Sequence, residues 1–173
     1  MKMFVLIVYC TLFLVTAVQC FNLDVSHTII YQDPSKSVGS RGSYFGFSLL
    51  LYAGANGTDP WIQIGAPRGN DTYTLKGVME PGVVYRCFIS QACKTVALDD
   101  KRSNIKETKY YPDDKNKAWI GGAMDIDENN DRVAVCGHRW SYFKTEDRFS
   151  YMLGVCYWSH IHHNISDTTE FIK

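Results

Sequence analysis

The sequence lacks an excess of charge of either sign, because 18 Lys and Arg residues balance 18 Asp and Glu residues in a chain of 173. Proteins that bind nucleic acid or acidic membrane surfaces by charge carry a basic field, so we expect no nucleic-acid partner. Beyond its N-terminus the chain also lacks a second long apolar run. A membrane-spanning helix needs about 20 consecutive apolar residues, and we expect no such anchor in the remainder of the chain.

The sequence also has none of the short motifs that mark common catalytic and cofactor sites. Residues 46–50 read Gly-Phe-Ser-Leu-Leu, so Ser48 lacks the second glycine of the Gly-x-Ser-x-Gly turn that exposes a nucleophilic serine. The sequence contains no Gly-rich phosphate loop and no Cys-x-x-Cys pair for zinc. We therefore expect neither enzyme activity nor a cofactor.

Two segments hold metal-ligand side chains without the spacing that a metal site requires. Residues 125–131 offer alternate carboxylates to calcium, but they lack the glycine and the later bidentate acid of an EF-hand loop. A second segment contains His160, His162 and His163 beside a glycosylation sequon, and imidazoles can bind zinc. We interpret the first segment as a solvated acidic hairpin and the second as an exposed loop, so no metal is expected.

The N-terminus has the pattern of a secretory signal peptide over residues 1–20. Lys2 precedes an apolar run over residues 3–18, and cleavage is predicted after Cys20, so that the mature chain begins at Phe21. A short signal anchor is the alternative, although the run is shorter than the roughly 20 residues of a spanning helix. The chain is therefore predicted to enter the secretory pathway.

Four cysteines remain after the signal peptide: Cys87, Cys93, Cys136 and Cys156. An even number in an oxidising compartment indicates two disulfides, with three possible connectivities. Closeness in the sequence favours Cys87–Cys93 and Cys136–Cys156. Sequons that fit the same compartment and predict exposed, N-glycosylated loops occur at Asn56, Asn70 and Asn164.

An internal repeat runs through the rest of the chain. Residues 45–49 are echoed by 120–124, residues 61–67 by 132–138, and residues 82–85 by 154–157, at nearly equal offsets. Residues that alternate between apolar and other types, such as Ile62 with Ile64 and Val133 with Val135, predict half-buried strands. Between the two copies, residues 98–117 are charged and are predicted to form a long exposed loop.

Short strands and turns without a helical apolar period predict an all-β fold. The aromatic content of 14% also suits strands. A unit of three or four short strands cannot bury its apolar face alone, and radial repetition in a β-propeller provides the missing contacts. A sandwich or barrel with two similar hairpins is the alternative.

These residues resemble a known family. The stretch Ser43-Tyr-Phe-Gly-Phe-Ser48, followed by Trp61-Ile-Gln-Ile-Gly-Ala-Pro67, is similar to the Phe-Gly/Gly-Ala-Pro (FG-GAP) repeat of integrin α subunits. Further similarity follows in the family's order at residues 21–24, 82–87, 133–140 and 154–157. The resemblance implies a seven-bladed β-propeller. Residues 21–173 would hold about two blades, with repeat 1 at about 21–95 and repeat 2 at about 110–173.

The resemblance also implies a function. It suggests an adhesion receptor on the extracellular side of the plasma membrane that pairs with an integrin β subunit and binds an extracellular-matrix or cell-surface protein. By motif position it assigns Phe47 and Trp119 to an aromatic cage for a basic residue of the β subunit, with ordinary packing inside the blades as the alternative. The two favoured disulfides match the family pattern. The family's calcium loops lie in later blades, so no cofactor is expected in this segment.

Two other functions stay open on the sequence. One is a secreted, soluble binding protein or decoy made of the same repeats. The other is an accessory propeller domain of an extracellular hydrolase, since similar repeats occur in a secreted phospholipase. Gly46, Gly65 and Gly121 are interpreted as structural in every case, because glycine permits tight turns and close backbone approach.

Overall fold

The computed structural model describes residues 25–34, 42–54, 59–70, 75, 77–89, 91–99, 113–144 and 149–166. The predicted signal peptide and the sequon at Asn56 lie outside these residues. The chain divides into two units after Ile30, and in the first unit the described secondary structure is one 3-10 turn, η1 (Val25–His27). All the described strands lie in the second unit, Tyr31–Lys173.

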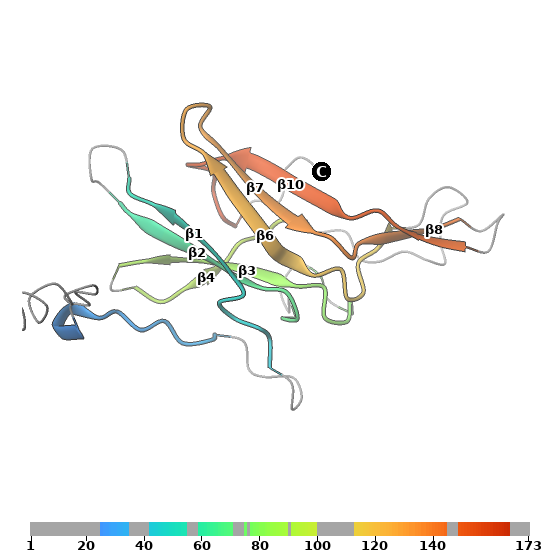
Figure 1. Cartoon of the computed structure of the whole chain (residues 1–173), viewed down its shortest axis with the longest axis horizontal. Coiled ribbons are helices and arrows are strands. Elements are labelled where there is room, and N and C mark those ends of the chain that lie inside the picture. The colour runs from blue at the N-terminus through green and yellow to red at the C-terminus, as the bar shows by residue number, and fades with distance from the viewer. Residues whose placement is uncertain are drawn as a thin grey trace, which may run out of the picture. The chain divides into compact units, whose positions relative to one another are not determined.

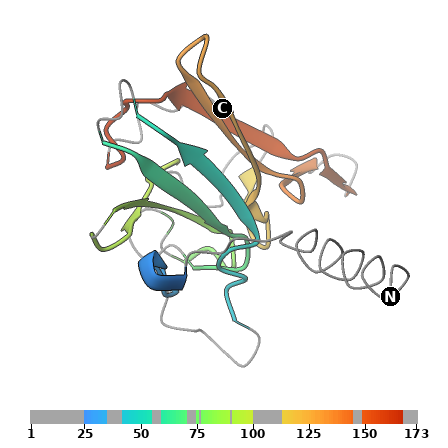
Figure 2. The same cartoon turned by 60° about the vertical axis from the view of Figure 1, so that its left-hand side comes forward.

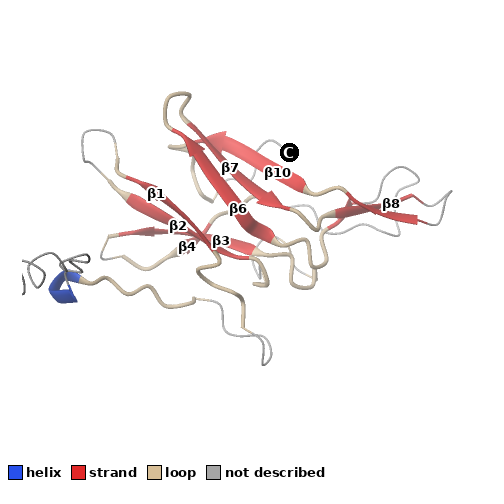
Figure 3. Ribbon diagram, in the orientation of Figure 1, coloured by secondary structure: helices blue, strands red, loops and turns tan. Residues whose placement is uncertain are grey.

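The described part of this second unit is built from antiparallel strands, which confirms the all-β class (Figures 1 and 3). The first sheet has the order β1-β2-β3-β4, formed by β1 (Ser48–Tyr52), β2 (Trp61–Ala66), β3 (Val83–Phe88) and β4 (Lys94–Thr95). None of the helices in the described residues is long and apolar enough to cross a membrane.

The second sheet has the order β6-β7-β10, formed by β6 (Ile120–Asp127), β7 (Arg132–Gly137) and β10 (Val155–His160). The predicted hairpin turn joins β6 to β7 at residues 128–131. A smaller sheet has the order β5-β8-β9, and its strands β8 and β9 come from the chain between β7 and β10 (Figure 1). Its strands are β5 (Asp113–Asp114), β8 (Ser141–Lys144) and β9 (Phe149–Met152).

The first and second sheets have the same register. Leu49 lies opposite Ile64, and Ile64 lies opposite Tyr85. The corresponding row of the second sheet is Met124, Val135 and Tyr157. Each residue of this second row holds the place in its motif that its counterpart holds in the first copy, as the repeat predicts. The chain therefore contains two blades of one kind, whereas the predicted ends of each repeat stay predictions.

The two blades pack face to face, with β6 against β1 and β2 (Figure 2 gives a second view). Leu50, Tyr52 and Trp61 of the first blade form a buried cluster with Val133 and Ile161 of the second. Burying a side chain of this size contributes about 1.5–3 kcal/mol. A second buried cluster, in which Val84 and Val96 meet Val135 and Tyr157, also joins the blades.

Glycine makes the closest approach of the two blades possible. A Cβ atom placed on Gly65 would lie 2.1 Å from the carbonyl oxygen of Gly121. The same carbonyl oxygen accepts a hydrogen bond of 2.6 Å from Ser48 Oγ. Ser48 therefore has a structural role between the blades.

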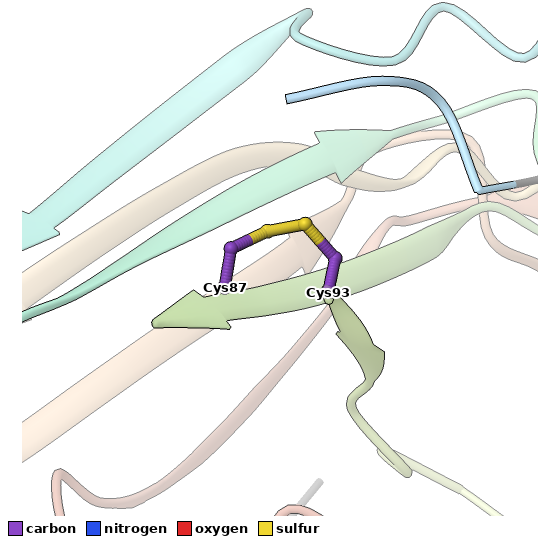
Figure 4. Close-up of a disulfide and its surroundings, with 2 residues drawn as sticks. All are labelled: Cys87 and Cys93. Carbon is purple, nitrogen blue, oxygen red and sulfur yellow. A yellow bond between two sulfur atoms is a disulfide. The ribbon is translucent and has the colours of Figure 1, made fainter. Parts of the chain in front are cut away.

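Both disulfides favoured by the sequence are present. Cys87–Cys93 ties the end of β3 to the residue before β4 (Figure 4). Cys136–Cys156 joins directly opposed residues of β7 and β10. Each blade therefore has one covalent link between neighbouring strands.

The prediction of an exposed loop over residues 98–117 is wrong at both ends of that segment. Leu98 and Asp99 are buried, and Lys115 is fully buried. Lys115 Nζ lies 2.7 Å from Asp113 Oδ2 and 3.4 Å from Asp99 Oδ2. Two carboxylates explain how a lysine can be buried at this position, since buried charges need partners.

Candidate functional site

Three aromatic side chains from both blades form one exposed cluster, here called the aromatic surface: Tyr44, Phe47 and Trp119. The Phe47 and Trp119 rings lie 5.6 Å apart, edge to face. Tyr44 lies 6.4 Å from Phe47 and 6.0 Å from Trp119. Tyr44 is 45% exposed and Phe47 is 52% exposed, while Trp119 is half-buried. Such an exposed cluster of rings is typical of a binding surface.

The Phe-Gly motif is the turn that positions this surface. The N–H of Phe47 donates to the carbonyl oxygen of Tyr44 at 3.0 Å, and Gly46 has a φ of 88°. A four-residue turn with a positive φ at its third residue has the pattern of a type II turn, which favours glycine there. In the second blade the same turn is closed by the N–H of Gly122 on the carbonyl oxygen of Trp119 at 2.9 Å.

Tyr44 and Trp119 occupy the same position of the repeat, as the first residue of this turn. Both have a φ of 60°, in the left-handed region that large side chains rarely adopt. Such residues cost of order 1–3 kcal/mol and are found where a function or the surrounding structure requires them. The strained backbone accompanies both aromatic rings on the same exposed surface.

The structure brings together the two residues that motif position assigned to a cage, and it adds Tyr44. Sequence reasoning missed Tyr44 because it took Phe47 as the residue directly after Phe-Gly and Trp119 as the residue two positions before Gly121. These are different positions of the repeat. Aligning residues 45–49 with 120–124 and extending the match by one position pairs Tyr44 with Trp119, and this pairing was the signal that could have found it.

Two arginines flank the aromatic surface. The Arg68 guanidinium lies 5.2 Å from the centre of the Tyr44 ring, and the Arg139 guanidinium lies 5.5 Å from that of Trp119. Arg68 also forms an ion pair with Glu80 at 3.0 Å. Hydrogen bonding to the Glu80 side chain is the main cause that raises the pKa of Arg68. The Tyr44 side of the surface is therefore nearly neutral.

No protein-family model matches the chain. Among curated proteins it is similar to integrin alpha-4 of Xenopus laevis, with 30% identity over 152 residues that cover 83% of this chain and 14% of the relative. The chain is related to integrin α subunits. Integrin alpha pat-2 of Caenorhabditis elegans is 27% identical over 152 residues, 84% of this chain and 12% of the relative.

A further integrin α relative covers nearly the whole chain. Integrin alpha-5 of Xenopus laevis is 26% identical over 175 aligned residues, which cover 96% of this chain and 15% of the relative. The chain thus spans 12–15% of the length of these three integrin α subunits. Their similarity extends over both blades.

The acidic segment of the present chain, residues 125–131, forms a turn held by its own hydrogen bonds. Asp127 Oδ1 accepts hydrogen bonds from the backbone N–H groups of Asn129 and Asn130 at 3.1 and 3.2 Å. The Asn130 side chain donates to Asp127 Oδ2 and is the first cause that lowers the pKa of Asp127. An aspartate that accepts hydrogen bonds from backbone N–H groups two and three residues later is typical of an exposed turn, as predicted for this hairpin.

The prediction of an exposed loop for the three histidines is wrong in part, because His160 ends β10 and His163 is buried, although His160 and His162 are exposed. His160 Nδ1 lies 3.4 Å from Asp131 Oδ2, and the His162 ring lies 5.8 Å from that of Tyr52. His163 Nδ1 lies 2.9 Å from Ser159 Oγ. Within the residues that the structure describes, no three His, Cys, Asp or Glu side chains gather as a metal site.

Two of the three predicted glycosylation sequons lie in the described part of the chain. Asn164 is exposed, and its Oδ1 accepts a hydrogen bond from the N–H of Ser166 at 3.1 Å. Asn70 is half-buried, and its Oδ1 accepts one from the N–H of Glu80 at 2.7 Å. Both bonds use the amide oxygen, whereas a glycan is attached through the amide nitrogen. Glycosylation at Asn56, Asn70 and Asn164 stays a prediction.

Proposed function

We propose that the chain is the extracellular propeller portion of an integrin-type adhesion receptor, and that its aromatic surface binds a basic side chain of an integrin β subunit. The receptor would bind an extracellular-matrix or cell-surface protein through this heterodimer. Its role would be binding and not catalysis. The similarity to integrin α subunits over 83–96% of the chain supports this proposal.

One observation carries the β-subunit contact. Phe47 and Trp119 come from different blades and meet at 5.6 Å, while 52% of Phe47 stays exposed. An ammonium or guanidinium group over such rings gains about 0.5–2 kcal/mol, and more where water is excluded. A surface assembled from two blades also forms only when both are folded, which would couple pairing to a correctly built propeller.

The test replaces the most exposed ring of the surface. The chain is co-expressed in a secreting cell with each soluble β-subunit ectodomain of the same organism, and the complex is recovered through the β subunit. Phe47→Ala should lower recovery about 5- to 30-fold, since loss of a central aromatic contact costs about 1–2 kcal/mol. Phe149→Ala is the matched control, because Phe149 is a 64% exposed phenylalanine on β9.

The outcomes separate clearly. Equal recovery of Phe47→Ala and wild type would reject the aromatic contact. Failure of the wild-type chain to pair with any β subunit would reject the proposed function as a whole. Normal secretion of Phe47→Ala in the absence of β subunit shows that the variant folds.

A further inference from the structure

Arg139 is a cation at the edge of the aromatic surface, and no described carboxylate neutralises it. Its guanidinium lies over the Trp119 ring at 5.5 Å, and its side chain is half-buried. No carboxylate among the described residues forms an ion pair with it. Unlike the buried Arg86, which donates to the Gln63 side chain and the Ile161 carbonyl oxygen, the Arg139 guanidinium has no hydrogen-bond acceptor among the described residues, and a half-buried charge gains from a partner.

Two other arginines of this chain stack on a ring and also lie near an acid, whereas Arg86 stacks on Trp61 and donates to neutral oxygen acceptors. Arg68 stacks on Tyr44 and forms an ion pair with Glu80 at 3.0 Å. Arg132 stacks on Trp158 at 4.5 Å and lies directly opposite Asp127 in the pairing of β6 with β7. Each combines an aromatic ring with an acid from the same chain. Arg139 has the ring without the acid in the part of the chain that the structure describes.

The backbone fixes Arg139 in this place. Its N–H donates to the carbonyl oxygen of Ala118 at 3.1 Å, and Ala118 is fully buried next to Trp119. The N–H of Trp140 closes the same turn on the carbonyl oxygen of Gly137 at 3.3 Å. The adjacent His138 ring lies 5.3 Å from the Trp119 ring. Arg139 is therefore held beside Trp119 by the fold.

Among Arg68, Glu80 and Arg139, this arrangement leaves one positive charge beside the aromatic surface. Arg68 and Glu80 cancel, and Arg139 remains. A basic side chain that approached the rings would meet this charge and would be repelled. An acidic side chain placed between the two cations would attract both and so remove the repulsion, as in complementary protein interfaces.

We propose that Arg139 pairs with an acidic side chain of the integrin β subunit, next to the basic side chain that the aromatic surface would bind. This inference rests on the proposed function, and it names the second charge that the partner must carry. The partner surface would thus present a basic and an acidic group side by side. A partner with the basic group alone would bind poorly.

The test uses the secreted chain with the β-subunit ectodomain that it recovers best. Arg139→Gln should lower the affinity about fivefold, because loss of a close charge pair at an interface weakens binding by at least this factor. Arg139→Glu should lower the affinity further, because it places a like charge against the acidic side chain. Arg132→Gln is the matched control, since Arg132 stacks on a tryptophan at the opposite end of β7. Raising NaCl from about 0.05 M to about 0.5 M should lower the affinity of the wild-type chain for the β subunit more than that of Arg139→Gln.

A charge exchange gives a second, independent readout. Exposed Asp and Glu residues of the β ectodomain are changed to Lys one at a time, and one of these variants should restore binding to Arg139→Glu. Thermal unfolding midpoints within about 2 °C of wild type, together with normal secretion, show that the Arg139 variants fold. Absence of any restoring substitution would contradict the inference.

The results also distinguish this inference from the proposed function. Unchanged or tighter binding by Arg139→Gln, with binding lost in Phe47→Ala, would reject the acidic partner and keep the aromatic contact. Weaker binding by Arg139→Gln, with no effect of Phe47→Ala, would keep the acidic partner and reject the aromatic contact. If the wild-type chain pairs with no β subunit, both are rejected.

Discussion

The guanidinium of Arg86 lies 4.1 Å from the centre of the Trp61 ring, in the contact between the two blades. Arg86 also donates to Gln63 Oε1 at 3.2 Å and to the carbonyl oxygen of Ile161 at 3.3 Å. Its exposed fraction is 3%, and burial lowers the pKa of Arg86 to about 10. A cation of the first blade thus binds the backbone of the second.

Removing this side chain should weaken the contact between the blades. Arg86→Ala loses two hydrogen bonds and leaves a void beside Trp61, so the free energy of unfolding should fall by about 2–4 kcal/mol. Arg86→Met keeps most of the volume without a buried charge and should cost only about 1 kcal/mol. Urea denaturation followed by tryptophan fluorescence measures both. Equal losses in the two variants would show that the charge, and not the packing, stabilises the contact.

Gly65→Ala should prevent the two blades from closing. The added Cβ would lie 2.1 Å from the carbonyl oxygen of Gly121 and 2.3 Å from Ser48 Oγ, and backbone at this distance must move. We expect a loss of more than about 3 kcal/mol, as for severe overpacking. Gly77→Ala is the control, because Gly77 has a φ of 84° but open space around it. Its cost should be limited to about 1 kcal/mol of backbone strain.

The measurement for the glycine variants is the yield of secreted, disulfide-bonded protein and its urea midpoint. Gly65→Ala should be retained in the cell or unfold at low urea, while Gly77→Ala should be secreted. If both variants are secreted with the same midpoint, the backbones of the two blades are not as close as the structure places them.

Tyr157 should make the fold sensitive to alkaline pH. Its hydroxyl donates to Asp99 Oδ2 at 2.9 Å, and burial followed by the charge of Asp99 raises the pKa of Tyr157. An unfolded tyrosine titrates near 10, so above that pH the unfolded chain loses a proton that the folded chain keeps. The free energy of unfolding contributed by this group is therefore present below about pH 10 and is lost as the pH rises above it.

The pH test compares wild type with Tyr157→Phe by urea denaturation from about pH 8 to about pH 11. At the lower end the variant should be less stable by about 1–2 kcal/mol, because the buried Asp99 loses a donor. The difference should shrink above about pH 10. Tyr151→Phe, at a 38% exposed position, should follow the wild-type curve. A difference that stays constant across the range would contradict the assignment.

The sequence predicts the fold well where the identity and spacing of a few residues determine the strand register or the turn type. The nearly equal offsets between repeated motifs correspond to equivalent register rows, because a slip of a single position would turn every side chain of a strand to the other face. The Phe-Gly pair is likewise informative, since the third residue of the turn must have a positive φ. The two disulfides join cysteines only 6 and 20 residues apart.

Sequence reasoning fails where distant residues define a site together. Lys115 is buried because Asp99 and Asp113 lie beside it, and Tyr157 reaches the same group from β10. The local sequence shows only charge, which normally indicates a solvated loop. The charges flanking the aromatic surface are of the same kind, because Arg68 and Arg139 reach their rings across turns and strands.

Equivalent positions of the two blades differ in exposure, so the two outer faces of the pair are different. Leu49 and Leu51 are 58% and 71% exposed, and their counterparts in the second blade, Met124 and Ile126, pack against the first. On the opposite face the order is reversed: the buried Leu50, Tyr52 and Trp61 correspond to the exposed Asp125, Asp127 and Arg132.

The outer face of the first blade is therefore apolar, and the outer face of the second blade is charged. Copies of the chain that met head to tail would have to bury Asp125, Asp127 and Arg132 against leucines, at a cost that exceeds the apolar gain. The charged face therefore disfavours head-to-tail association of one copy of this chain with another. Replacing Asp125, Asp127 and Arg132 by apolar residues should therefore increase head-to-tail self-association of the chain.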